Sequence, residues 1–482
     1  MSNRPETNKQ SYPVYKKCGG CQLQNLSYPE QLEFKQRKVE KLLKRFCTVE
    51  KIIGMKTPYH YRNKVQAAFY TDKKGKIISG VYQSGSHHVV GIDSCQTEDV
   101  IADKIIVAVR KLLPSFRMTT YNEDTGKGFL RHILVKRGFA TNQIMLVLVT
   151  GTPVFPSKNN FVKAILKQFP EITTIVQNIN PYRTNLVLGD NQKVLYGKGY
   201  IEDILCGCRF RISPKSFYQI NPVQTEVLYG KAIEFANLKG NETVLDTYCG
   251  IGTIGIIAAK NGAGNVIGAE LNGDAVRDAI VNARANNLKN IRFYKADAGE
   301  FMREAADEDE KPDVVFMDPP RAGSDRKFLD SLIKMSPKKV VYVSCNPETL
   351  ARDLAYLTQN SPYKAQKIQP VDMFPHTAHI ETVVLLSKGE VDSKKIRVEF
   401  SLEDMDMSEF QDGATYPQIK EYVLEHTGLK VSNLYISQIK RKCGIGVGKN
   451  YNLPKSEDSR QPQCPQEKEK AIREAFKYFG MI

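Results

Sequence analysis

Cys345 lies where a buried strand is predicted to turn into a helix. The apolar run 339–343 precedes it, and residues 348–352 have the pattern of a helix start. The N-terminus of a helix lowers the pKa of a nearby thiol and so favours the thiolate, which is the nucleophilic form. A free cysteine is more often an inert part of the core, so the assignment of Cys345 as a nucleophile depends on the motifs around it.

Two acidic residues occupy comparable places. Asp318, in the sequence Asp-Pro-Pro-Arg, follows the apolar run 313–317, and Glu381 opens the apolar run 382–386. Open α/β sheets bind ligands at the carboxyl ends of their strands, so both carboxylates and the thiol of Cys345 are predicted at such an edge. Glu381 is the candidate general base; the alternative is a surface acid at the start of an edge strand.

A glycine-rich turn around Gly250 follows a further apolar strand, 243–247, which carries Asp246, and both residues are candidate cofactor contacts. Glu270 ends the next strand, at roughly the spacing expected for a carboxylate that binds a ribose. Asp297 closes a third strand and is placed to accept a hydrogen bond from an adenine amino group. The turn departs from the dinucleotide fingerprint and lacks the Gly-Lys-Ser/Thr of a triphosphate site. We interpret it as a pocket for S-adenosylmethionine.

The chain from residue 217 to residue 386 resembles the uracil-C5 RNA methyltransferases that make 5-methyluridine in bacterial transfer and 23S ribosomal RNA. The matching motifs, in order, are Phe217-Tyr218-Gln219-Ile220-Asn221, Tyr248-Cys249-Gly250, Glu270, Asp318-Pro319-Pro320-Arg321, Ser344-Cys345-Asn346-Pro347 and residues 372–381. The resemblance implies that Cys345 is the nucleophile and Glu381 the proton acceptor. The cofactor contacts that it implies are Gln219, Tyr248, Glu270 and Asp318. One departure is Thr253, where the family often carries Asn.

The chemistry explains why a thiol and a base are needed together. Uracil C5 is too weak a nucleophile to take a methyl group directly, so a thiolate first adds to C6, and the C5 proton must later be removed by a base. An exocyclic-amine methyltransferase would share the cofactor turn but have no use for Cys345. A non-catalytic RNA-binding or ribosome assembly factor would need neither Cys345 nor Glu381. The favoured substrate is 23S rRNA, and tRNA is the alternative.

The composition indicates a polyanionic partner. The 482 residues include 69 Lys and Arg against 53 Asp and Glu, a formal net charge of +16, which favours RNA. No apolar stretch has the length of a membrane span and no secretory signal is visible. The 10 cysteines do not have the spacing of a disulfide framework. We therefore expect a cytoplasmic RNA-binding protein that acts as a monomer without a membrane.

The predicted fold class is α/β, a Rossmann-like class I S-adenosylmethionine-dependent methyltransferase domain with a doubly wound, mostly parallel sheet. A β-rich α+β RNA-binding domain precedes it and a small helical extension follows. The expected parts are an N-terminal cysteine-containing segment and helix (1–55), the central domain (56–215), the catalytic domain (216–390) and the extension (391–482). Arg62, Lys64 and Arg131 in the central domain resemble family residues that grip RNA; the alternative is an ordinary solvated basic face.

Cys18, Cys21 and Cys95 resemble the cysteines of the family's iron–sulfur segment. That segment has four cysteines, and the position of the first holds Tyr12 in this chain. A four-iron cluster is normally held by four thiolates. Loss of the cluster or weak binding is therefore expected, while a zinc site and a cluster with one other ligand stay open. The chain also begins too close to this motif for the small β-barrel domain that many relatives carry.

The extension 391–482 has two stretches with helical spacing, 416–426 and 433–442. We expect a helical module that increases RNA affinity without taking part in methyl transfer. The basic residues expected against phosphates are Lys440, Arg441, Lys442 and Lys449. The alternative is an element that covers part of the catalytic domain.

Overall fold

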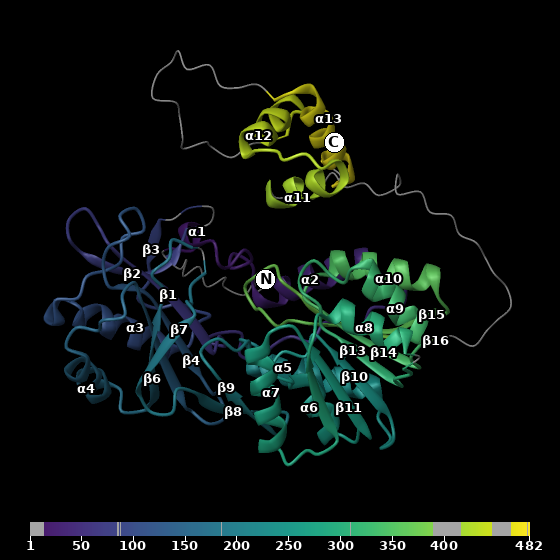
Figure 1. Ribbon diagram of the computed structural model, residues 1–482, viewed down its shortest axis with the longest axis horizontal. Coiled ribbons are helices and arrows are strands. Elements are labelled where there is room, and N and C mark those ends of the chain that lie inside the picture. Colours follow the sequence, from purple (N-terminus) through teal and green to yellow (C-terminus); the bar gives the residue numbers. More distant parts are fainter. Residues whose placement is uncertain are drawn as a thin grey trace, which may run out of the picture. The chain divides into compact units, whose positions relative to one another are not determined.

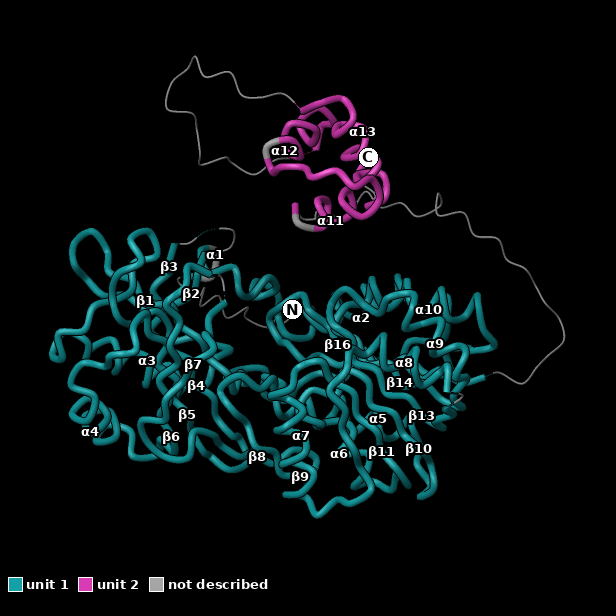
Figure 2. The backbone as a smooth tube through the Cα atoms, in the orientation of Figure 1, with its two compact units in different colours: residues 1–392 teal, residues 393–482 magenta. Residues whose placement is uncertain are grey.

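The computed structural model describes residues 14–83, 86, 88–184, 186–308, 310–388, 416–445, 464–479 and 481–482. The chain forms two compact units, residues 1–392 and residues 393–482 (Figure 2). Two seven-stranded sheets and a two-stranded sheet lie among the described residues of the first unit. The second unit is helical in the parts that the structure describes.

A mostly parallel sheet occupies the second half of the first unit (Figure 1). Its strand order is β12-β11-β10-β13-β14-β16-β15, and β16 runs antiparallel to β14 and β15 on either side of it. The strands are β10 (Thr243–Thr247), β11 (Asn265–Glu270), β12 (Ile291–Lys295), β13 (Val314–Met317), β14 (Lys339–Ser344), β15 (Tyr363–Val371) and β16 (Glu381–Lys388). The inner strands are mostly apolar because both of their faces are covered.

Helices cover the two faces of this sheet in separate layers. Phe316 packs in the core with α5 (Pro222–Ala236), α6 (Thr253–Lys260) and α7 (Gly273–Ala285). The next residue, Met317, points to the opposite face. It packs there with α8 (Ala298–Asp307), α9 (Arg326–Met335), α10 (Pro347–Asn360) and the N-terminal helix α2 (Tyr28–Leu43). The predicted doubly wound fold class is confirmed.

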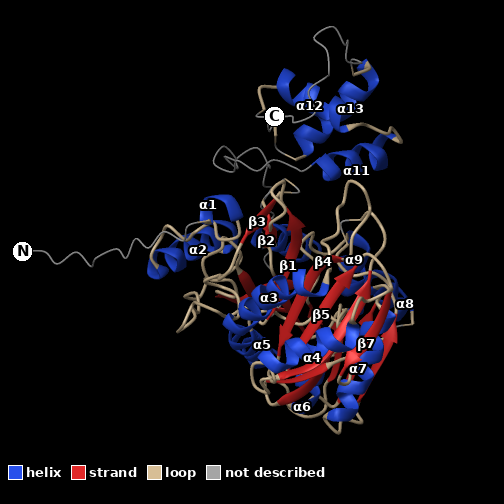
Figure 3. Ribbon diagram, turned by 90° about the vertical axis from the view of Figure 1, so that its left-hand side faces the viewer, coloured by secondary structure: helices blue, strands red, loops and turns tan. Residues whose placement is uncertain are grey.

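The central sheet has the order β3-β2-β1-β4-β5-β6-β7, with β5 and β6 parallel and the other pairs antiparallel. Its strands are β1 (Lys64–Thr71), β2 (Ile77–Tyr82), β3 (Val89–Gly91), β4 (Leu130–Arg137), β5 (Ile144–Thr150), β6 (Ile172–Ile179) and β7 (Asn191–Tyr196). Helices α3 (Val100–Leu112) and α4 (Lys158–Gln168) pack with it in one core, and η1 (Pro114–Phe116) follows α3 (Figure 3).

The cores of the two sheets are continuous. The hairpin of β8 (Ile201–Leu205) and β9 (Cys208–Ile212) lies between them. Phe210 of this hairpin belongs to the same buried cluster as Val147 of the central sheet and Ile254 of α6. The segments 56–215 and 216–390 are therefore joined by a shared apolar core within one compact unit.

The N-terminal segment contributes to the helix layer on one face of the methyltransferase sheet. It contains α1 (Tyr15–Cys18) and α2, and Val39 and Leu43 of α2 are buried in one core with Ile368 of β15. A capping box at Ser27 starts α2, because Ser27 and Glu30 satisfy each other's backbone N–H groups. Helix α2 of the predicted segment 1–55 thus packs on the methyltransferase sheet.

A buried ion pair fixes α2 to the loop that follows β15. Lys35 and Asp372 are both 0 % exposed, and Lys35 Nζ lies 2.5 Å from Asp372 Oδ1. Lys35 also donates to the carbonyl of Phe374 at 3.0 Å, and the Tyr28 hydroxyl donates to Asp372 Oδ2 at 2.8 Å. Every charge in this group has a polar partner, as a buried ion pair requires.

The second unit has its own small core. Its helices are α11 (Tyr416–Thr427), α12 (Asn433–Lys442) and α13 (Gln466–Tyr478). Ile419, Ile436, Ile472 and Phe476 are each 0 % exposed and pack against one another in one cluster. Over the described parts of the chain, no helix combines the length and the apolar character needed to cross a membrane.

We expect Lys35→Met to lower the free energy of unfolding by about 3–5 kcal/mol, because the variant leaves the Asp372 carboxylate buried without its counter-charge. Urea denaturation of the full chain measures the loss. Lys44→Met, at an exposed position just after the same helix, is the matched control and should change little. The double variant Lys35→Met/Asp372→Asn should recover much of the loss. A loss below about 1 kcal/mol in the single variant would contradict this role.

Candidate active site

Strand pairing brings the predicted site residues to one edge of the catalytic sheet. Thr247 pairs with both Met317 and Ala269. The residues that follow them, Tyr248, Asp318 and Glu270, therefore lie at neighbouring strand ends. In the antiparallel pair of β14 and β16, Ser344 lies opposite Thr382. The adjacent residues Cys345 and Glu381 therefore meet at this same edge.

The turn after β10 has backbone conformations that few side chains tolerate. Tyr248 has φ 62°, Gly250 φ 56° and Gly252 φ 80°. A Cβ at Gly252 would approach the ring of Phe293 to 2.7 Å, whereas a Cβ at Gly250 would meet open space. The turn is thus packed on its inner side and open at Gly250, where the backbone can approach a ligand.

Two of the predicted cofactor carboxylates accept hydrogen bonds from the backbone, and their contact with the cofactor stays a prediction. Asp246 is 1 % exposed and accepts a hydrogen bond from the Gly255 N–H at 2.7 Å, so it holds the turn from beneath. Asp297 caps α8 by accepting from Gly299 N–H at 2.9 Å and Glu300 N–H at 3.2 Å. These contacts give Asp246 and Asp297 local structural roles that sequence spacing did not reveal.

Glu270 and Gln219 are each held in place by hydrogen bonds. The Glu270 carboxylate accepts from Gly250 N–H at 3.0 Å and Asn272 N–H at 2.7 Å, which fixes its orientation at the turn. The segment of Gln219 is held by Asn63, which donates from its side chain to the Gln219 carbonyl at 3.1 Å. Both side chains are partly exposed.

The thiol of Cys345 is half-buried, and the environment differs from the expected one. Burial, with the Glu381 and Asp318 carboxylates as further causes, raises the pKa of Cys345 to about 11. The expectation of a lowered pKa was wrong. The first turn of α10 is capped by Asn346, whose side chain accepts from Glu348 N–H at 3.1 Å, so the helix terminus already has a polar partner.

Burial also raises the pKa of both carboxylic acids of the site. The pKa of Asp318 rises to about 7. The pKa of Glu381, which is 4 % exposed, rises well above the ordinary value through burial and the nearby Asp318. Titratable groups with such shifts at a strand edge are typical of catalytic sites.

Arg321, the last residue of the Asp-Pro-Pro-Arg motif, provides the positive charge of the site. It lowers the pKa of Cys345 and of Glu381, opposing their burial. Its guanidinium lies 2.6 Å from Nδ1 of His379, whose own pKa is lowered to about 4 by burial and by Arg321. His379 is therefore neutral near pH 7 and can accept the hydrogen bond.

Sequence reasoning missed Tyr229 at the site and did not single out Phe217, which is close to Gln219 in the chain. Tyr229 of α5 is 4 % exposed, lies 3.5 Å from Gln219 through its hydroxyl, and is an electrostatic neighbour of Asp318 and Glu381. Phe217 is 64 % exposed, two residues before Gln219. Phe217 could have been noticed because it belongs to the same sequence motif as Gln219. Nothing in the sequence of α5 distinguishes Tyr229 from a core residue of the helix.

The predicted RNA-binding residues have different surroundings. Arg131 is 3 % exposed and donates to the carbonyls of Asn180 at 2.7 Å and Tyr182 at 2.6 Å. This placement gives Arg131 a structural role, and its contact with RNA stays a prediction. Arg62 and Lys64 are half-buried at the start of β1. They remain predictions.

The three cysteines of the N-terminal motif lie near one another. Cys18 and Cys95 are electrostatic neighbours of Cys21, and burial first, then Cys95, raises the pKa of Cys21 to about 11. Within the described part of the chain, no group of three or more His, Cys, Asp or Glu side chains is arranged to hold a metal ion. Tyr12 lies outside the described residues. Loss of the cluster, or weak binding of it, stays a prediction.

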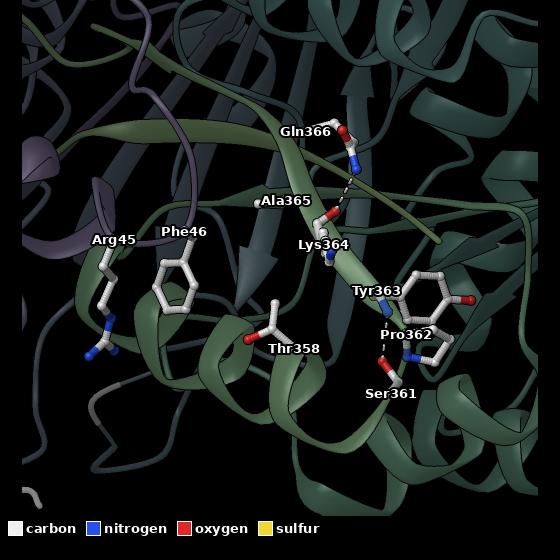
Figure 4. A pocket seen from close by; sticks show the side chains of 9 residues that line it. All are labelled: Arg45, Phe46, Thr358, Ser361, Pro362, Tyr363, Lys364, Ala365 and Gln366. Carbon is white, nitrogen blue, oxygen red and sulfur yellow. Dashed lines mark hydrogen bonds between the residues drawn. The ribbon is translucent and has the colours of Figure 1, made fainter. Parts of the chain in front are cut away.

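A cavity of about 420 Å³ in the first unit lies elsewhere (Figure 4). It is lined by Arg45, Phe46, Thr358 and residues 361–366. These lining residues include the start of β15, whereas the far end of that strand, Val371, pairs with Glu381. The cavity is therefore at the opposite edge of the sheet from Cys345.

Comparison with known proteins points to RNA methylation. Residues 183–389 match the family described as tRNA (Uracil-5-)-methyltransferase. An RNA methyltransferase of Bacillus cereus is 44% identical over 383 residues, which are 78% of this chain and 83% of the relative. One from Listeria monocytogenes is 46% identical over 77% of this chain and 82% of its own length.

A solved structure agrees with these relatives. It is the crystal structure of Pyrococcus abyssi tRNA (uracil-54, C5)-methyltransferase in complex with S-adenosyl-L-homocysteine. It is 31% identical, covers 76% of this chain and 85% of its own, and has a TM-score of 0.65.

The pKa of about 11 for Cys345 predicts how the thiol reacts with iodoacetamide. Its alkylation should rise about tenfold per pH unit between pH 7 and pH 9, because the thiolate fraction rises in that proportion below the pKa. Peptide mass spectrometry measures the rate, with glutathione as the reference thiol. Arg321→Met should slow the reaction, since it removes the charge that lowers this pKa. A rate for Cys345 that levels off by pH 8 would contradict the raised pKa.

The cysteine arrangement predicts less than one four-iron cluster per chain, even in protein purified without oxygen. Iron and sulfide analysis with visible absorption measures the content. Tyr12→Cys, which supplies a fourth thiol at the family's position, should raise the iron content, and Tyr12→Phe is its control. Stoichiometric iron in the unchanged protein would refute the prediction.

Proposed function

The chain belongs to the RNA (uracil-5-)-methyltransferase family, and we propose that it methylates C5 of a uridine in 23S rRNA through a covalent bond between Cys345 and uracil C6. It is an S-adenosylmethionine-dependent RNA methyltransferase. The observation that carries the proposal is the meeting of Cys345 and Glu381 at the same sheet edge as the open turn at Gly250.

S-adenosylmethionine, when bound, supplies an electrophilic methyl group. The residues that would hold it are Gln219, Tyr248, Glu270 and Asp318, around the turn at Gly250. The fit rests on the fixed Glu270 carboxylate, whose remaining lone pairs suit ribose hydroxyls. The open space at Gly250 leaves room beside the backbone.

Cys345 and Glu381 would then act in sequence. The Cys345 thiol gives its proton to solvent water and its sulfur adds to C6, which makes C5 nucleophilic. After C5 has gained its methyl group, Glu381 takes the C5 proton, and the C6–S bond breaks to return the thiolate. Formation of the C–S bond removes the thiolate charge near Glu381, and with it a like charge that would keep the acid protonated. Arg321 favours the ionised form of both groups.

A flipped uridine also needs a surface that replaces its lost stacking. Phe217, 64 % exposed beside Gln219, offers an aromatic face at the edge of the site. Base flipping costs a few kcal/mol, and stacking on an aromatic ring offsets part of that cost. Arg62 and Lys64 are the residues proposed to hold the neighbouring phosphates.

The substrate has two candidates. The cysteine segment resembles that of the rRNA enzymes, which supports 23S rRNA. The structural similarity to a tRNA (uracil-54, C5)-methyltransferase supports tRNA. Mass mapping of both RNAs from a strain lacking the gene separates them. Loss of 5-methyluridine from 23S rRNA alone supports the first, and loss from tRNA alone replaces it with the second.

The covalent mechanism predicts opposite behaviour of two variants. With RNA that contains 5-fluorouridine, the unchanged enzyme should form a gel-stable complex, and Cys345→Ala should form none because no sulfur is available for C6. Glu381→Gln should accumulate the adduct on ordinary RNA, since proton removal is the step that it lacks. Asp313→Asn, at the opposite end of β13, is a control that should methylate normally. A gel-stable complex of Cys345→Ala with the 5-fluorouridine RNA would contradict the proposal.

A further inference from the structure

Four aromatic rings form one cluster on the second unit. Tyr422 and His426 of α11 stack with centroids 3.9 Å apart at 17°. Tyr478, the last residue of α13, lies 4.5 Å from Tyr422 at 31°, and Phe479 lies edge-on to Tyr478 at 5.0 Å and 83°. We call these four residues the aromatic platform.

The platform is exposed at one end, although the unit buries the aromatic side chain of Phe476 completely. Tyr478 is 66 % exposed, whereas Phe476, two residues earlier, is 0 % exposed. His426 is exposed as well. The Tyr478 ring is held in place by Tyr422 and Phe479, so a ligand that stacks on it would find a ring that is already ordered.

Basic residues elsewhere on the unit are used internally. Lys442 pairs with Glu469 at 2.6 Å, and Lys440 lies over the ring of Tyr416 at 5.1 Å. Lys440 and Lys442, two of the residues expected to contact phosphates, therefore have partners within the unit. Lys449, another of them, lies outside the described residues. Lys477, directly before Tyr478, is exposed. Lys and Arg outnumber Asp and Glu in the described part of the unit, which suits a polyanion.

We propose that the aromatic platform binds single-stranded RNA by stacking an unpaired base on Tyr478. Every base has a π-face, and stacking on aromatic side chains near basic groups is how proteins bind single strands without reading their sequence. The family match ends at residue 389, so this site lies outside the methyltransferase part. RNA as the ligand class rests on the proposed function, but the binding site is separate from the chemistry at Cys345.

The absence of tryptophan from the sequence permits a direct test in the full chain. Tyr478→Trp keeps an aromatic face and makes residue 478 the only fluorescent indole. Titration with oligouridylate should quench this fluorescence, because a base stacks on the indole, and a fully paired RNA duplex should not. No quenching by oligouridylate at concentrations that saturate binding would overturn the proposal. It would instead favour a platform that packs against protein.

Affinity provides the second measurement. Tyr478→Ala should raise the Kd for oligouridylate about fivefold or more, with an unchanged melting temperature, and Tyr478→Phe should bind like the unchanged protein. Leu424→Ala removes another exposed apolar side chain, 44 % exposed on α11, and is the matched control. An equal Kd for Tyr478→Ala and Leu424→Ala would refute the platform. Turnover at saturating RNA should not change in either variant. If the unchanged enzyme does not methylate RNA at all, that result counts against the proposed function and not against the platform.

Discussion

The buried pair of Lys35 and Asp372 is the constraint on which the catalytic edge depends. The two residues are 337 positions apart in sequence, and their pairing fixes the start of the loop that leads to Glu381. The same helix contacts the loop again through Gln31, which accepts from His376 N–H at 2.8 Å. Leu23 N–H, next to the cysteine motif, donates to the His376 carbonyl at 2.9 Å. The N-terminal segment is thus a brace for the loop that ends at the proposed base.

Such a brace explains why an ion pair is used where apolar contacts would suffice for stability. A buried pair gives little net stability, but loss of one partner is costly, so it tolerates few alternative arrangements. The loop also contains His376 in a left-handed conformation, φ 69°, which the surrounding contacts must hold. A base that removes a proton from one carbon must be positioned within hydrogen-bond reach, and rigid anchoring of its loop supplies that precision.

Much of the fold and the outline of the site can be predicted from sequence, because the motif residues directly follow apolar runs that form strands. The places of Cys345, Glu381 and Asp318 follow from apolar runs and the residues after them. Sequence could not show that distant carboxylates and burial raise the pKa of the thiol. It also could not show that Arg131 is enclosed by carbonyls, since its neighbours come from another strand and a loop. Nor could spacing show that Asp246 accepts a hydrogen bond from Gly255 N–H inside the turn.

The raised pKa of Cys345 fits its proposed task better than the lowered one expected from the helix. A permanent thiolate would be exposed to oxidation and would be an intrinsically weaker nucleophile, because nucleophilicity falls as the pKa falls. A thiol with a raised pKa stays protonated, and so resists oxidation, until a substrate enters. Each thiolate that then forms is a strong nucleophile. Arg321 lies where it can stabilise that thiolate, and a bound uracil would exclude water from the pair and strengthen their attraction. On this argument the environment of Cys345 couples the formation of the nucleophile to the arrival of the base.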